Sequence, residues 1–315
     1  MDLQTAKYPL QQCGVLAVRG VDARKFLQGQ LSQDMAKVSE QFSPLAGYHN
    51  PQGRTIAVLR LLHAAPDDIL LLTQRALIAG LIERLRRFVL RAKVTLADDS
   101  AQWQAWGLTD RSARELCERH ALTPLPSAAG ATLALPQGLL WRHAAPSGRA
   151  LALLHAGTET LASLPTGDAS HWELADIEDG LPEIYPATSE AFVAQMLNLD
   201  ALGGIAFDKG CYAGQEVIAR AHYRGRVKRH MQRFSLLDPA IDLAAGDTAT
   251  IDDGRTIRVV RAARAAAQQG QQLLAVTAMA ASADAVAAAT DEPAAASGRG
   301  VIRVTARDLP YAIAD

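Results

Sequence analysis

The stretch GIAFDKGCYAGQEVIARAHYRGRVKRH, residues 204–230, places a cysteine in a glycine-containing turn directly before a run of cations. Cys211 follows Gly210, and Gly214 stands three residues later, so the backbone of this turn can be approached closely. Lys209 precedes the turn, and a neighbouring cation favours the thiolate, the reactive form of cysteine. A free cysteine is equally often a small buried apolar residue. Taken alone, Cys211 fits either role.

Six of the cations after the turn occupy even positions. If the segment is extended, successive side chains alternate between two faces, and these six point one way. Such a basic face suits phosphate, a polyanion or a carboxylate tail. Two alternatives stay open: residues 215–220 can form a helix that scatters the first charges, and a basic strand edge can simply discourage aggregation. The positions are Arg220, His222, Arg224, Arg226, Lys228 and His230.

Length and composition describe an ordinary globular protein. The 315 residues suffice for two or three domains, and 49% of them are hydrophobic while 21% are charged. With a net charge of −1, the molecule as a whole does not attract nucleic acid electrostatically, so any anion has to bind at a local basic patch. No apolar run approaches the roughly 18 residues of a membrane span, and no secretory signal is visible.

The cysteines indicate neither a disulfide framework nor a metal site. Cys13, Cys117 and Cys211 are an odd number at unrelated spacings, which fits neither a set of disulfides nor a metal site. We therefore expect a reducing compartment, the cytoplasm.

Hydrophobic periodicity predicts a mixed α+β chain. Residues 20–35 and 75–92 have the spacing of amphipathic helices, whereas 53–62 and 67–73 are short apolar runs typical of strands. After about residue 231 the pattern changes to short extended segments separated by turn residues, which predicts a small all-β unit, sandwich or barrel.

An acidic turn lies upstream, where Asp176, Glu178 and Asp179 precede Gly180 and a proline. A carboxylate accepts two hydrogen bonds from a ligand edge with adjacent N–H donors, such as a pterin ring. Judged from the residues alone, solvated acids at the end of a helix are the favoured interpretation.

Together these residues resemble the YgfZ-type folate-binding proteins, a family related to the glycine cleavage system T-protein, an aminomethyltransferase. The family's most specific motif, Lys-Gly-Cys-Tyr-x-Gly-Gln-Glu, stands here as KGCYAGQE at residues 209–216. Residues 178–182 (EDGLP), 195–210, 219–229 (ARAHYRGRVKR) and 26–34 (FLQGQLSQD) resemble further family elements. The resemblance covers both α/β parts of the chain.

The resemblance implies two intertwined α/β domains and a small C-terminal β-barrel around a central opening. We place these regions at residues 1–100, 101–230 and 231–315. It also implies that the chain binds tetrahydrofolate or a derivative and serves the assembly or repair of iron–sulfur clusters in client enzymes, including enzymes that modify tRNA.

The resemblance assigns roles to particular side chains. We expect Cys211 to be the reactive thiol with Lys209 beside it, and Glu178 to hold the pterin edge. No metal site is expected, because an iron–sulfur cluster usually takes four thiolates; a partner would have to supply the others. The remaining expected folate-binding residues are Gly180, Gly210, Tyr212, Gly214, Gln215, Glu216, Arg220, Arg224, Arg226 and Lys228.

One departure separates this chain from the T-protein. Residues 47–62 correspond to the segment that carries the T-protein's key aspartate, yet they contain no acidic residue, and Ile56 and Ala57 stand near that position. Without this carboxylate, acid–base help for aminomethyl transfer has no obvious source. Two alternatives stay open: a one-carbon transferase with the carboxylate replaced from elsewhere, and an adaptor whose basic face binds tRNA or a modifying enzyme.

Overall fold

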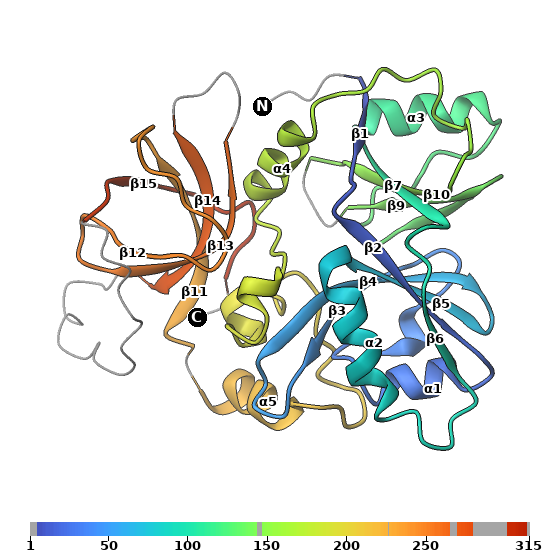
Figure 1. Ribbon diagram of the computed structural model, residues 1–315, viewed down its shortest axis with the longest axis horizontal. Helices are drawn as coiled ribbons and strands as arrows, with labels where there is room; N and C mark the ends of the chain where they lie inside the picture. The colour runs from blue at the N-terminus through green and yellow to red at the C-terminus, as the bar shows by residue number, and fades with distance from the viewer. Residues whose placement is uncertain (1–4, 144–146, 226, 265–269, 280–300, 314–315) are drawn as a thin grey trace.

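The computed structural model describes residues 5–143, 147–225, 227–264, 270–279 and 301–313. Within these ranges the chain forms three five-stranded sheets, in which every strand pair is antiparallel, with five α-helices packed between and around them. Figure 1 shows the three sheets as separate groups of strands. The expected mixture of helices and strands is thus confirmed.

The first sheet is buried on both faces. Along β2 the side chains of Leu16 and Val18 join one apolar cluster, and those of Val15 and Ala17 join another, as the two-residue period of a strand requires. The helix α2 (Ile78–Arg86) packs on β2 and β6. In spatial order the strands are β3 (Leu45–His49), β4 (Thr55–Ala65), β5 (Asp68–Gln74), β2 (Cys13–Arg19) and β6 (Thr95–Asp98).

The second sheet takes its edge strand from the start of the chain. Strand β1 pairs with β7, whereas β2, only a few residues later, lies in the first sheet, so the N-terminal segment connects the two. Helix α3 (Asp110–Arg119) begins where the Thr109 hydroxyl accepts a hydrogen bond from the backbone N–H of Ser112. In order the strands are β1 (Lys7–Pro9), β7 (Trp103–Leu108), β10 (Ala150–His155), β9 (Gly138–Arg142) and β8 (Thr132–Leu135).

The third sheet forms the C-terminal part of the chain. Among the described residues, its two edge strands, β12 and β15, form no ladder with each other, and one isolated bridge joins Ile251 to Ile302. The expected β-barrel is therefore confirmed only as an open antiparallel sheet. In order the strands are β12 (Thr248–Thr250), β13 (Thr256–Ala263), β14 (Gln271–Ala278), β11 (Arg229–Leu236) and β15 (Val304–Arg307).

Helix α4 (Ala169–Glu178) lies between the sheets and contacts β1 of the second and β13 and β14 of the third (Figure 1). It begins at Asp168, whose carboxylate accepts from the backbone N–H of Ser170. The other helices are α1 (Ala23–Gln28), α5 (Gln215–Arg224) and the short 3₁₀ helices η1 (Met35–Lys37), η2 (Arg75–Leu77), η3 (Pro186–Thr188) and η4 (Ala194–Leu197).

The two helices expected in the first third are shorter than their periodicity suggests. Residues 20–35 contain only the six-residue α1, and residues 75–92 contain η2 and α2, which ends at Arg86. None of the helices in the described ranges has the length and apolarity that a bilayer crossing requires. The three linear domain boundaries and the central opening stay predictions.

Candidate functional site

Cys211 is exposed in a short loop whose neighbours are fixed. The ammonium of Lys209 donates hydrogen bonds to the backbone carbonyls of Gln28 (2.7 Å), Leu31 (2.7 Å) and Gln33 (3.0 Å). An ammonium has three N–H donors, and these three carbonyls engage all of them. Lys209 therefore ties the cysteine loop to the turn that follows α1.

On the other side of Cys211, the ring of Tyr212 is buried and lies 5.0 Å from the Lys209 ammonium. Burial raises the pKa of Tyr212 to about 12. Burial also lowers the pKa of Lys209 to about 8, although the nearby carboxylate of Asp34 opposes that change. The thiol thus projects outward between two inward-pointing anchors.

The two glycines of the motif differ in what surrounds them. Gly214 has φ +80°, and a Cβ there would lie 2.5 Å from the carbonyl oxygen of Asn50 and 2.9 Å from Cα of Gly53. A Cβ on Gly210 would meet nothing within 4 Å. Only Gly214 is thus required by a close backbone contact. The side-chain amide of Gln215 donates a hydrogen bond to the backbone carbonyl of Lys209 at 3.4 Å and closes the loop.

The alternating arrangement of cations is wrong for the first half of the run. Residues 215–224 form helix α5, which begins after the left-handed Gly214. On this helix Arg220 lies one turn from Glu216 and pairs with it at 2.8 Å, with both side chains largely exposed. The open alternative, a helix that scatters the first charges, is the one that the structure adopts.

The other members of the run lie in different surroundings. His222 stacks on Phe207, with ring centroids 3.7 Å apart, while Arg224 and Lys228 are exposed. His230 is buried in β11 and contacts the side-chain oxygen of Asn198 at 3.2 Å. Arg226 lies outside the described residues.

Glu178, the expected pterin ligand, is the last residue of α4 and is half-buried. The turn after it is held by the C-terminal segment: the hydroxyl of Tyr311 donates to the carbonyl of Gly180 at 2.7 Å, and a Cβ on Gly180 would meet the Tyr311 ring. Asn198 donates to the same hydroxyl at 3.3 Å. Asn198 directly follows η4, and in η4 the side chain of Gln195 donates a hydrogen bond to the backbone carbonyl of Ile218 in α5 at 2.7 Å. Contacts around η4 therefore connect the Glu178 turn to the helix of the cysteine motif.

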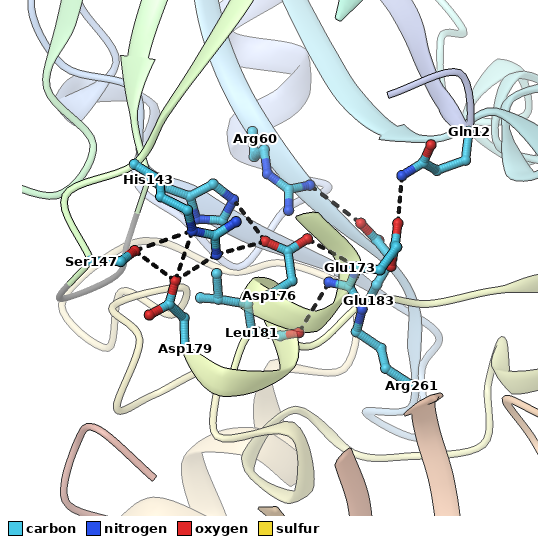
Figure 2. A network of polar contacts seen from close by, with 11 residues as sticks. Gln12, Arg60, His143, Ser147, Glu173, Asp176, Asp179, Leu181, Glu183 and Arg261 are labelled. Atoms are coloured by element: carbon cyan, nitrogen blue, oxygen red, sulfur yellow. Dashed lines mark hydrogen bonds and ion pairs between the residues drawn. The ribbon is translucent and has the colours of Figure 1, made fainter. Parts of the chain in front are cut away.

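A buried charge network, missed at the sequence level, surrounds α4 (Figure 2). Arg149 binds Asp176 at 2.9 Å and also contacts Asp179, and Arg261 binds the other oxygen of Asp176 at 2.9 Å. Arg261 also contacts Glu173. Asp176 and Asp179 are 5% and 7% exposed, so the interpretation of these two as solvated acids is wrong.

Elements from all three sheets supply this network. Arg60 of β4 pairs with Glu183 at 3.4 Å, and His143, just after β9, has its Nε2 3.6 Å from Asp176. Arg261 comes from β13. Burial alone would raise the pKa of Asp176, but Arg261 and Arg149 outweigh it and hold that pKa well below the usual value.

Burial also shifts the pKa values of two other groups in the network. It lowers the pKa of His143 well below its usual value, and it raises the pKa of Glu183 despite Arg60. The signal available in the sequence was arginine inside apolar strand runs, such as LRLL at 59–62 and RVVRAA at 258–263. A buried arginine requires a carboxylate partner.

A second missed residue lies behind the cysteine loop. His49 at the end of β3 is 1% exposed, and its ring lies 6.4 Å from that of Tyr212. Neither ring nitrogen has a hydrogen-bond partner among the described residues. Burial lowers its pKa to about 3, so the imidazole is neutral at physiological pH.

The three thiols lie in unlike environments. Cys117 is buried in α3, and burial raises the pKa of Cys13 to about 12, which keeps that thiol protonated. Cys211 alone of these three is exposed. The described residues contain no group of three or more His, Cys, Asp or Glu side chains arranged to hold a metal ion.

Comparison with known proteins decides the family. No family model matches the chain. It is 33% identical over 232 residues to the tRNA-modifying protein YgfZ of Colwellia psychrerythraea, covering 72% of this chain and 70% of that protein. It is 31% identical over 309 residues to the tRNA-modifying protein YgfZ of Edwardsiella ictaluri, covering 93% and 88%. This chain belongs to the YgfZ family.

Among solved structures, the YgfZ-family chain has the fold of the glycine cleavage system aminomethyltransferase T from Bartonella henselae. The TM-score is 0.61 with 14% sequence identity, covering 86% of this chain and 78% of that one. The resemblance seen in the sequence, to YgfZ proteins and through them to the T-protein, is thus confirmed for family and fold.

Proposed function

We propose that this YgfZ-family protein is a folate-binding accessory protein for tRNA-modifying and other iron–sulfur enzymes, with Cys211 as its reactive group. The observation that carries the proposal is the presentation of Cys211, an exposed thiol between two anchored neighbours, Lys209 and Tyr212. A thiol with only a structural role would be expected in a core, as Cys117 is. The relatives named tRNA-modifying proteins support the link to tRNA modification.

The folate part of the proposal rests on the Glu178 turn. The neighbouring Asp179 is held by Arg149, and Gly180 is held by Tyr311, so both sides of the turn are fixed. A carboxylate on such a turn suits the adjacent N–H donors of a pterin edge. Arg224 and Lys228, exposed at and beyond the end of α5, are candidates for the carboxylates of the folate tail.

An aminomethyltransferase activity receives no support from the corresponding strand. Ile56 and Ala57 of β4 are 5% and 0% exposed and belong to the apolar core, so no acid–base group stands at this place. Similarity to the T-protein at 14% identity concerns the fold alone.

Isothermal titration calorimetry of the purified protein with tetrahydrofolate tests ligand binding. We expect Glu178→Ala to weaken binding about 30-fold or more, which is the loss of about 2 kcal/mol expected for hydrogen bonds to a charged group. Cys211→Ala should bind as the wild type does. Glu118→Ala, which removes an exposed carboxylate from α3, is the matched control. Equal binding by Glu178→Ala and Glu118→Ala would remove Glu178 from the site.

The role of the thiol is tested in cells that lack their own YgfZ-family protein. Introducing this chain should restore the modified-nucleoside content of bulk tRNA, and the Cys211→Ala variant should not. If Cys211→Ala restores it as well as the wild type does, the reactive-thiol proposal fails, whatever the outcome of the folate titration.

A further inference from the structure

Figure 1 shows the turn that joins α2 to β6. Apolar side chains are exposed in this turn among cations. Phe88 is 51% exposed and Leu90 89% exposed. Val21, 67% exposed, belongs to the same area, because the neighbouring Asp22 accepts a 2.8 Å hydrogen bond from the backbone N–H of Lys93. We define the α2–β6 surface as Val21, Arg86, Phe88, Leu90, Arg91 and Lys93.

Cations outnumber carboxylates on this surface. Residues 84–93 contain five arginines and lysines and no acidic residue. Arg84 pairs with Glu190, and Arg87 pairs with Glu83. No carboxylate of the described residues pairs with the side chains of Arg86, Arg91 or Lys93, although the carboxylate of Asp22 lies at the Lys93 backbone.

Helix stability explains only part of this charge. Cations in the last turn of a helix favour its negative end, which accounts for Arg86 in α2. Arg91 and Lys93 lie beyond the end of α2, where that effect has faded. The local excess of positive charge in a chain of net charge −1 therefore suits an anionic partner.

The backbone adds an independent observation. Leu90 has φ +42°, a left-handed conformation that L-residues adopt at an energetic cost. Its side chain is almost fully exposed, so packing within this chain does not offset the cost. Residues held in such conformations concentrate at binding sites.

The chemistry of the surface favours RNA over a lipid membrane. A membrane-surface helix needs a free apolar face, but the apolar face of α2, formed by Ile78, Leu81 and Leu85, is buried in the core. Arginine binds phosphate with two parallel hydrogen bonds, and an exposed aromatic ring such as Phe88 stacks on an unpaired base.

We propose that the α2–β6 surface binds an unpaired segment of RNA. Arg86, Arg91 and Lys93 contact its phosphates and Phe88 stacks on a base. The proposal goes beyond the folate and thiol functions and does not depend on them. It also places RNA on a different surface from α5, where Arg220 is already paired with Glu216.

Fluorescence anisotropy with a short fluorescein-labelled oligouridine tests the proposal across a range of salt concentrations. Each phosphate contact on a single strand contributes about −0.7 to the slope of log K against log salt. The double variant Arg86→Gln/Arg91→Gln should therefore reduce the magnitude of the slope by about 1.4. Phe88→Ala should lower affinity about tenfold with the slope unchanged, because stacking releases no counterions.

The matched control is Arg220→Gln/Arg224→Gln, which removes two cations from α5 and should leave both affinity and slope as in the wild type. Absence of wild-type binding at low salt, or an equal loss in the α5 control, would overturn the proposal. So would α2–β6 variants that bind the RNA normally but lose binding to vesicles of phosphatidylcholine and phosphatidylglycerol. Thermal unfolding of all the variants, and the tetrahydrofolate titration of the α2–β6 variants, show that the fold and the folate site are intact.

Discussion

Lys209 shows how one side chain can hold a reactive neighbour in place. Its ammonium engages three carbonyls of residues 28–33, so the loop that carries Cys211 is fixed to the end of α1 and the turn after it. The sequence placed Lys209 beside the thiol and suggested an electrostatic role. Sequence could not show that the ammonium points inward, because its three acceptors are about 180 residues away in the chain. They are also backbone carbonyls, which every residue type carries, so no residue type in the sequence marks them as partners.

Replacing Lys209 should therefore affect both stability and the loop. We expect Lys209→Met to lower the free energy of unfolding by about 2 kcal/mol, since three carbonyls lose a charged donor. Urea denaturation measures this loss, and peptide mass spectrometry after iodoacetamide treatment should show a changed alkylation rate at Cys211. The control, Lys228→Met at an exposed lysine, should stay within about 0.5 kcal/mol of the wild type. If both variants are equally stable, Lys209 is no anchor.

His49 predicts a loss of stability in acid. The folded protein keeps this imidazole neutral down to a pKa of about 3, while the unfolded chain takes up a proton below about pH 6.5. Between these values the unfolded chain binds more protons, so the contribution to stability is lost as the pH falls. At pH 5 the loss is about 2 kcal/mol relative to pH 7.

The check is chemical denaturation of the wild type and His49→Leu at pH 7 and pH 5. The variant should lose about 2 kcal/mol less than the wild type between these two pH values. His49→Asn, also non-titrating, serves as a second variant should the leucine disturb the tight contact with Gly47. An identical loss in wild type and variants would show that other groups cause the acid sensitivity.

At the scale of elements, local patterns predicted type better than extent. Strands β4 and β5 lie within or near the apolar runs that predicted them, because both faces of the first sheet are buried and need continuous apolar sequence. The alternating cations failed as a strand pattern. The first of these cations lie on α5, where successive side chains are spread around the helix instead of alternating between two faces.

The glycines of the KGCYAGQE motif allow a matched test of this element. Gly214→Ala should lower the free energy of unfolding by about 3 kcal/mol, because L-residues are strained at φ +80° and the new Cβ would press on the Asn50 carbonyl. Gly210→Ala, with open space around its Cβ, should stay within about 0.5 kcal/mol of the wild type. Denaturant unfolding of the pair measures both. Equal losses would mean that the motif keeps its glycines for a reason other than backbone conformation.

At the scale of the whole molecule, α4 joins the three sheets through charge as well as apolar packing. Its carboxylates meet Arg149 at the second sheet and Arg261 at the third, while Arg60 of the first sheet reaches Glu183 beyond the helix. Motif resemblance predicted the family and the mixed α/β fold. It could not predict this junction, since each ion pair joins residues that are at least 27 positions apart and depends on how the sheets pack.

The junction should be most sensitive at Arg261, which is 3% exposed and binds both Glu173 and Asp176. Arg261→Met leaves these carboxylates without a buried cation from the third sheet, and we expect a loss of about 3 kcal/mol or more in the free energy of unfolding. Removing one carboxylate as well, in Arg261→Met/Glu173→Met, should recover part of that loss, because an uncompensated buried charge costs more than an apolar pair. Denaturant titration of the two variants distinguishes these cases; a double variant less stable than Arg261→Met would contradict charge compensation as the force that holds α4 to the third sheet.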